Sequence, residues 1–173
     1  MDNELMKFLM SKQNFIERWV EQGFDRKENC IAREAMHSNE EWKEIIEVCE
    51  KYCTYGNPLA KKFLFRGTIY RELKGVDPVI FDNNYVPWSK RKEGRTSGSA
   101  LGNLMRLSGL TLITYTLNND EYGFSVADYF EWLFKEDVSI KNKYSYVLEE
   151  KEVVFPLLKK NSEETKIKYI DTV

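Results

Sequence analysis

Histidine, cysteine and proline are scarce in this chain, and each shortage excludes a class of protein. The 173 residues contain one His, 3 Cys and 4 Pro. An odd number of cysteines argues against a disulfide scaffold and favours a reducing compartment, so we expect a cytoplasmic protein. With His37 as the single histidine, a histidine-based catalytic triad would depend on one residue that no motif supports.

The few potential metal ligands do not form a familiar site. Cys30, His37, Cys49 and Cys53 all lie in the first third of the chain. Their spacing matches no common zinc module, and buried thiols on a helix face are far more common than zinc ligands. We therefore expect no metal ion.

The chain also has no large net charge of either sign and no long apolar run. The 26 basic and 28 acidic residues leave a net charge of -2, so a nucleic-acid target is possible but disfavoured. No run approaches the roughly 18 apolar residues of a membrane-spanning helix, and the N-terminus does not resemble a signal peptide. The G-x-G-x-x-G and Walker motifs are absent, which argues against a Rossmann dehydrogenase and a P-loop nucleotidase.

Aromatic residues, by contrast, are abundant. Hydrophobic residues make up 42% of the chain and aromatic residues 14%, which predicts a folded core rather than disorder. Residues 1–57 are predicted to be a helical segment packed on a core of residues 58–173, and the expected class is α+β. Helices are predicted over 5–24, from a capping box at Ser38 and Glu41 to Gly56, over 100–109, and after Ser125, which Asp128 would help to cap. Strands are predicted over 63–70, 79–88 (with a turn or bulge at 82–84), 110–117, 146–155 and 166–172.

The first segment with visible chemistry is Phe65-Arg66-Gly67. An arginine within an apolar strand is costly to bury without an anion, which could be a carboxylate or a ligand phosphate. Gly67 would let a ligand approach the backbone. An arginine on the wet face of an edge strand explains the segment equally well.

The second segment is YVLEEKEVVFP, residues 146–156. In a strand, Glu150 and Glu152 would point to the same side, roughly 7 Å apart. Two such carboxylates suit acid–base or cation-stabilising chemistry, although a charge run of this kind is more often a solvated face. The third segment, Val86-Pro87-Trp88-Ser89, would offer a flat indole surface and a hydroxyl at a strand end.

Taken in this order, the three segments resemble the mono-ADP-ribosyltransferases of the Arg-Ser-Glu class. An Arg in a first strand, a Ser that ends a second, and Glu-x-Glu before an apolar pair and Pro together form that family's pattern, which here covers residues 63–173. The resemblance implies a split β-sandwich of mostly antiparallel strands with short helices. It also implies NAD as a substrate, a target protein as partner, and the setting of a toxin, an effector or a phage or bacterial modifier.

The resemblance also implies residue roles. Arg66, beside Gly67, would grip the NAD diphosphate, and Ser89, beside Trp88, would lie near the nicotinamide ribose and brace the catalytic carboxylate. Glu152 would stabilise the oxocarbenium-like centre, and Glu150 would orient or deprotonate the acceptor, with arginine acceptors favoured. Residues 139–149, including Tyr144 and Tyr146, would form a mobile target-recognition loop, and residues 90–96 a second flap.

The chain departs from the family pattern at one position. The second motif normally begins with a serine two residues before Ser89, and Pro87 stands there instead. This departure leaves room for a slow or degenerate enzyme. Two alternatives therefore remain beside the transferase: an NAD glycohydrolase on the same fold, and a non-catalytic interaction module.

Overall fold

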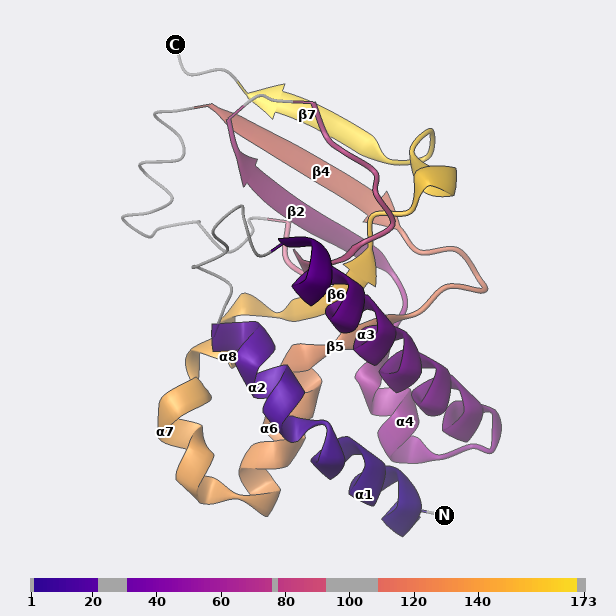
Figure 1. Cartoon of the computed structure of the whole chain (residues 1–173), viewed down its shortest axis with the longest axis vertical. Coiled ribbons are helices and arrows are strands. Elements are labelled where there is room, and N and C mark those ends of the chain that lie inside the picture. The colour runs from indigo at the N-terminus through magenta and orange to yellow at the C-terminus, as the bar shows by residue number, and fades with distance from the viewer. Residues whose placement is uncertain (1, 22–30, 76–77, 93–108, 171–173) are drawn as a thin grey trace.

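The computed structural model describes residues 2–21, 31–75, 78–92 and 109–170 (Figure 1). Its helices are α1 (Asp2–Ser11), α2 (Gln13–Glu21), α3 (Ile31–Thr54), α4 (Pro58–Phe63), α6 (Val126–Glu136), α7 (Lys141–Tyr144) and α8 (Tyr146–Glu150), with short 3-10 turns η2 (Val138–Ile140) and η3 (Lys159–Asn161). Its strands are β1 (Leu64–Phe65), β2 (Thr68–Lys74), β3 (Tyr85–Ser89), β4 (Leu110–Thr116), β5 (Gly123–Ser125), β6 (Glu152–Pro156) and β7 (Lys166–Ile170). Within these ranges, no helix is both long and apolar enough to cross a bilayer.

The strands form one antiparallel sheet that falls into two halves. The strand order is β1-β5-β6-β3-β2-β4-β7, so three strands separate β1 from β2 although only Arg66 and Gly67 lie between them in the chain. Gly67 has a φ of 150°, a value that favours glycine, and the chain bends there from one half to the other. The two halves share a single residue pair, Tyr70 with Ser89. Figure 1 shows β2, β4 and β7 as one layer, apart from β5 and β6.

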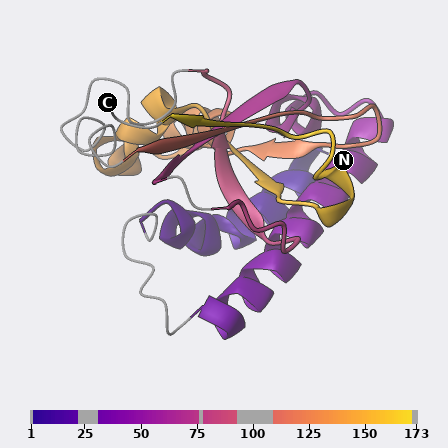
Figure 2. The same ribbon diagram turned by 90° about the horizontal axis from the view of Figure 1, so that it is seen from above.

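Each face of β6 packs into a different hydrophobic core. Val153 and Phe155 belong to a core between the two halves of the sheet, together with Ile69 of β2. Val154 belongs to a second core, which the N-terminal helices share with β5 and α6. Figure 2 shows these indigo and violet helices on one side of the strands. Because side chains alternate along a strand, Glu152 points to the same face as Val154, toward the helices.

The predicted α+β class is confirmed, whereas two helix boundaries are wrong. The helix predicted over 5–24 is interrupted after Ser11, where the Lys12 amide donates to the carbonyls of Phe8 and Leu9. The capping box at Ser38 does not begin a helix, since α3 already starts at Ile31. Strong helix formers precede Ser38, and they extend the helix through it. The predicted stop before Gly56 (φ 80°) is confirmed.

The strands with regular alternation are confirmed, and those interrupted by turn residues are shorter than predicted. β4 and β7 match the strands predicted over 110–117 and 166–172, and Ser125 caps α6 by accepting from the Asp128 amide. The strand predicted over 79–88 begins only at Tyr85, because Asn83 has a φ of 63° and the Asp82 carboxylate accepts from the Asn84 amide. The helix predicted over 100–109 and the loop after residue 92 lie outside the described residues, except for Gly109.

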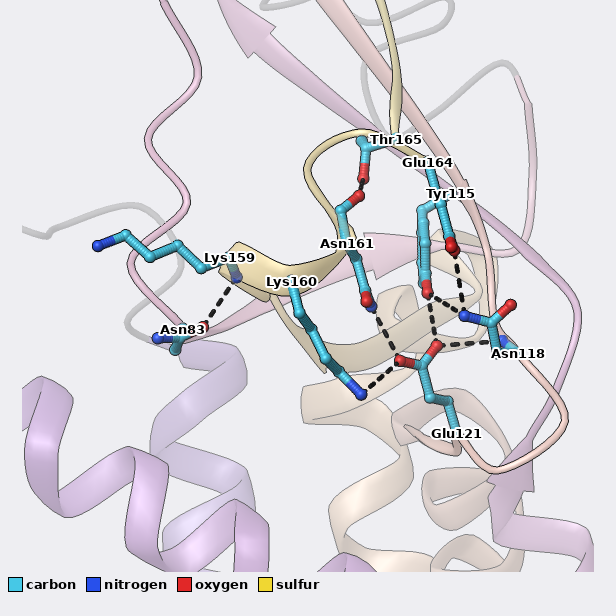
Figure 3. A network of polar contacts seen from close by, with 9 residues as sticks. All are labelled: Asn83, Tyr115, Asn118, Glu121, Lys159, Lys160, Asn161, Glu164 and Thr165. Carbon is cyan, nitrogen blue, oxygen red and sulfur yellow. Dashed lines mark hydrogen bonds and ion pairs between the residues drawn. The ribbon is translucent and has the colours of Figure 1, made fainter.

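A buried carboxylate joins the β4–β5 connection to the C-terminal part of the chain (Figure 3). Glu121 accepts hydrogen bonds from the Tyr115 hydroxyl at 2.6 Å, the Asn161 amide group at 2.9 Å and the Asn118 backbone amide at 3.0 Å. Lys160 lies 3.4 Å from the same carboxylate. Burial alone would raise the pKa of Glu121, but the hydrogen bonds from Tyr115 and Asn161, with the smaller contributions of Asn118 and Lys160, lower it overall.

Replacing Glu121 with glutamine is expected to lower the free energy of unfolding by about 1–3 kcal/mol at neutral pH, because the amide group leaves these donors poorly satisfied. A depressed folded-state pKa stabilises the fold above the ordinary glutamate value, and this contribution disappears as the pH falls through the folded value. Urea unfolding of both proteins should therefore show a large difference at pH 7 and a progressively smaller one as the pH falls below the ordinary glutamate pKa. A difference that does not depend on pH would contradict this role for Glu121.

Candidate active site

Ser89 and Glu152 lie opposite each other on the paired strands β3 and β6. Both side chains are buried, with Ser89 6% and Glu152 5% exposed. The Ser89 hydroxyl donates to the Glu150 carbonyl at 3.0 Å and accepts from the Arg91 amide at 3.0 Å. Ser89 therefore fixes the backbone that leads into Glu152.

The residues just before Glu152 form a helix and a turn. Tyr146–Glu150 is α8, and Lys151 ends it in the left-handed conformation with φ 50°. The Lys151 carbonyl then accepts from the Lys90 amide at 3.0 Å, which starts the pairing of β6 with β3. The strand predicted over 146–155 is thus wrong in its first half. Leucine and two glutamates favour a helix there, and the strand begins only at Glu152, just before the β-branched Val153 and Val154. Glu150 and Glu152 do not share one strand face.

Glu152 receives a hydrogen bond from the N-terminal helices. The indole Nε1–H of Trp19, in α2, donates to Glu152 Oε1 at 2.8 Å, across 133 residues of sequence. Trp19 itself is 7% exposed. The sequence analysis missed this residue, because its only signal was a place on the apolar face of a predicted helix.

Helix α2 is also held by the segment that precedes Glu152. The Tyr144 hydroxyl, at the end of α7, lies 2.7 Å from the Glu21 carboxylate and 3.0 Å from that of Glu17. Burial, opposed by Lys143 and assisted by the two carboxylates, raises the pKa of Tyr144 to about 12, so its hydroxyl stays protonated and donates. Residues 139–149 are largely helical, and Tyr144 is 1% exposed whereas Tyr146 is 37% exposed. Tyr144 thus anchors α2 and is not presented to a target.

Removing α2 from the site would be costly. Ile16, Trp19 and Val20 are buried in the core that the helices share with β5 and β6. Each such side chain stabilises the fold by about 1.5–3 kcal/mol. Their exposure would cost roughly 5–9 kcal/mol, which is comparable to the whole stability of a small domain. We therefore treat α2 as a fixed part of the structure around Glu152.

A second polar cluster lies beside Ser89, at the N-terminal end of α6. Lys90 Nζ pairs with the Asp128 carboxylate at 2.5 Å, and the Ser125 hydroxyl donates to the same carboxylate. Burial alone would raise the pKa of Asp128, but the hydrogen bonds from Lys90 and Ser125 lower it overall. Lys90 Nζ also lies 5.0 Å from the centre of the Phe65 ring, which connects the end of β3 to β1.

Arg66 follows β1 and is exposed, with its guanidinium 4.3 Å above the centre of the Tyr122 ring. Strand β1 pairs with β5, and β5 pairs with β6, and this register aligns Arg66 with Pro156 at the end of β6. Glu152 is at the opposite end of β6, as its first residue. The two positions are therefore offset by roughly 13 Å along the strands. The space above Gly67 is filled by the Phe65 ring, which a Cβ would meet at 3.1 Å.

Trp88 and Pro87 both have structural roles within the sheet. Trp88 is 4% exposed, belongs to the core between the two halves of the sheet and donates its indole N–H to the Phe155 carbonyl at 2.9 Å. Its ring therefore offers no exposed stacking surface. The Lys90 N–H donates to the carbonyl of Lys151, just before β6, so the alternation along β3 turns the backbone of Pro87 away from β6 and toward β2. Proline has no N–H to donate there, so its place in β3 costs no hydrogen bond to β6. The Pro87 carbonyl accepts from the Arg71 guanidinium of β2.

The described residues contain no group of three or more histidine, cysteine, aspartate or glutamate side chains that could hold a metal ion. Cys49 lies in the hydrophobic core, where burial raises its pKa to about 12 and keeps the thiol protonated. Cys30 lies outside the described residues. Comparison of the chain with protein-family models, curated proteins and solved structures finds no match.

Proposed function

We propose that this chain is an NAD-dependent mono-ADP-ribosyltransferase that moves ADP-ribose to a protein side chain, with arginine favoured, and releases nicotinamide. The observation that carries the proposal is the buried Glu152 carboxylate, at the start of a strand and directly opposite Ser89. A fixed carboxylate in a site shielded from water interacts strongly with positive charge that develops in a transition state.

In the proposed reaction, the bond between C1′ of the nicotinamide ribose and the nicotinamide nitrogen breaks, and its electron pair leaves with nicotinamide. Glu152 hydrogen-bonds a ribose hydroxyl and stabilises the oxocarbenium-like centre, as carboxylates do in glycoside cleavage. A lone pair of the acceptor then bonds to C1′, and the acceptor proton passes to a base. We assign that base to Glu150, at the C-terminal end of α8, because it is the carboxylate closest to Glu152 in the sequence. Ser89 holds the backbone between these two glutamates.

Arg66 is proposed to bind the NAD diphosphate. Arg66 follows Leu64 on the helix-facing side of the sheet, and its guanidinium is exposed, so a phosphate could reach it. Its offset from Glu152 suits an extended dinucleotide, whose diphosphate and nicotinamide ribose occupy different places.

An NAD glycohydrolase is the second candidate, and one observation favours it. Glu150 does not share a strand face with Glu152, so the carboxylate assigned to the acceptor is not held in the regular geometry that the sequence predicted. In that case water would be the acceptor, and free ADP-ribose the product.

Labelled NAD incubated with the purified chain and a bacterial lysate separates these candidates. A transferase should place the label on a discrete protein band, and Glu150→Ala should lower that transfer about 100-fold, because a general base contributes at least that much. Glu149→Ala, which removes an exposed neighbouring carboxylate, is the matched control and should leave transfer unchanged. Free labelled ADP-ribose without a labelled band, equal in wild type and Glu150→Ala, would indicate the glycohydrolase. If no NAD is consumed, the non-catalytic interaction module is the remaining candidate.

A further inference from the structure

We infer that Trp19 is a positioning residue for the Glu152 carboxylate, and that the N-terminal helices are therefore a working part of the site. This inference rests on the proposed function. It assigns a role in the reaction to residues that lie outside the segments with visible sequence motifs.

The contact has the geometry that such a role needs. The distance of 2.8 Å from Trp19 Nε1 to Glu152 Oε1 is that of a charge-assisted hydrogen bond. Both residues are buried, so bulk water does not compete for the indole N–H. The bond fixes one carboxylate oxygen and thereby limits rotation of the whole carboxylate group.

Trp19 is itself held rigidly. Its ring packs edge-on against Trp42, with ring centres 5.2 Å apart and an interplanar angle of 81°. Lys12, between α1 and α2, pairs with Glu41 of α3 at 2.7 Å. The packing of the ring on Trp42, and the ion pair that holds the start of α2 against α3, therefore help to keep the indole N–H aimed at Glu152, as preorganised catalysis requires.

The chemical nature of the donor suits the proposed reaction. A lysine or arginine at this place would cancel much of the negative field of Glu152. An indole N–H is a neutral donor, so Trp19 orients the carboxylate without itself cancelling the negative charge that acts on the developing positive ribosyl centre. Trp19 thus orients the Glu152 carboxylate and does not neutralise its charge.

The chain offers a matched control for the test. Trp132 of α6 is also buried in the same core, where its ring packs against Phe63 and Tyr129. Trp19→Phe and Trp132→Phe therefore make the same change in ring size, but only the first removes a donor to Glu152. Nicotinamide release from NAD is measured for both variants and wild type at a temperature where all three are folded.

The expected result is a fall in kcat of about 10- to 100-fold in Trp19→Phe, with the KM for NAD changed less than about threefold, because the lost bond involves a charged group. Trp132→Phe should change both constants by less than about threefold. Equal kinetic losses in the two variants would overturn the inference while leaving the transferase proposal intact. Absence of nicotinamide release by wild type would instead contradict the proposed function, and the inference would fall with it.

A second readout requires neither activity nor a folded Trp19→Phe variant. The chain has 4 Trp, so an indole N–H spectrum contains four side-chain signals. Single Phe variants of Trp42, Trp88 and Trp132 assign three of these signals, and the fourth then belongs to Trp19. The Trp19 signal should move in Glu152→Gln, whereas the Trp42 signal should stay in place. A Trp19 signal that ignores Glu152→Gln would show that the bond is absent in solution and would overturn the inference even if Trp19→Phe fails to fold.

Discussion

Replacing Glu152 with glutamine is expected to lower nicotinamide release from NAD about 100- to 1,000-fold. Glutamine has the size of glutamate, and its carbonyl oxygen can still accept from the Trp19 indole, so the fold should be preserved. What disappears is the negative charge opposite the developing oxocarbenium centre, and preorganised electrostatic groups of this kind contribute about that factor. Initial rates of NAD consumption measure the effect, and thermal unfolding checks the fold.

Glu149→Gln is the appropriate control for this experiment. It removes the same charge from the same segment, but Glu149 is exposed and lies on α8. Its rate should stay within about twofold of wild type, because surface charges are screened by salt. Glu152→Gln with unchanged turnover would remove Glu152 from the reaction.

Phe124→Ala is expected to lower the free energy of unfolding by about 3–5 kcal/mol, the largest stability effect we foresee. Phe124 is fully buried in β5, with ring centres 5.5 Å from Trp42, 6.0 Å from Phe63 and 5.9 Å from Tyr129. It therefore joins the N-terminal helices, α4 and α6 to the sheet. The loss of the ring leaves a cavity where these elements meet.

Urea unfolding measures this effect, with Tyr55→Ala as the comparison. Tyr55 is 62% exposed, so its truncation should change the free energy of unfolding by less than about 0.5 kcal/mol. Because Phe124 also lies opposite Val154 of β6, the variant should lose NAD turnover under conditions that partly unfold it. Similar losses of stability in both variants would mean that the helices and the sheet do not share a core.

Local signals in the sequence predicted the elements that local physics controls. The alternation over 110–117 gave a strand because one face of β4 is buried. Ser125 caps α6 with a bond to the backbone three residues on, and Gly56 supplies the positive φ that follows a helix end. In the same way, the Glu-x-Glu string and the strand-ending serine located Glu152 and Ser89, which the structure then pairs.

Contacts between distant segments were beyond the reach of the sequence. The Trp19–Glu152 bond joins residues 133 apart, and a tryptophan on an apolar helix face carries no sign of its partner. The stacking of Arg66 on Tyr122 likewise depends on the pairing of β1 with β5. The helix over 146–150 was missed for another reason: a continuous charged and apolar run fits a strand or a helix, and Lys151 sets the boundary by adopting a positive φ.

Nicotinamide release by the wild-type chain is the most direct measurement. Purified protein is incubated with NAD, with and without a bacterial lysate, and nicotinamide is quantified over time beside Glu152→Gln. The account predicts release by the wild type and a fall of about 100- to 1,000-fold in the variant. Equal release by both proteins would contradict the role of Glu152, and no release by either would contradict the proposed enzyme itself.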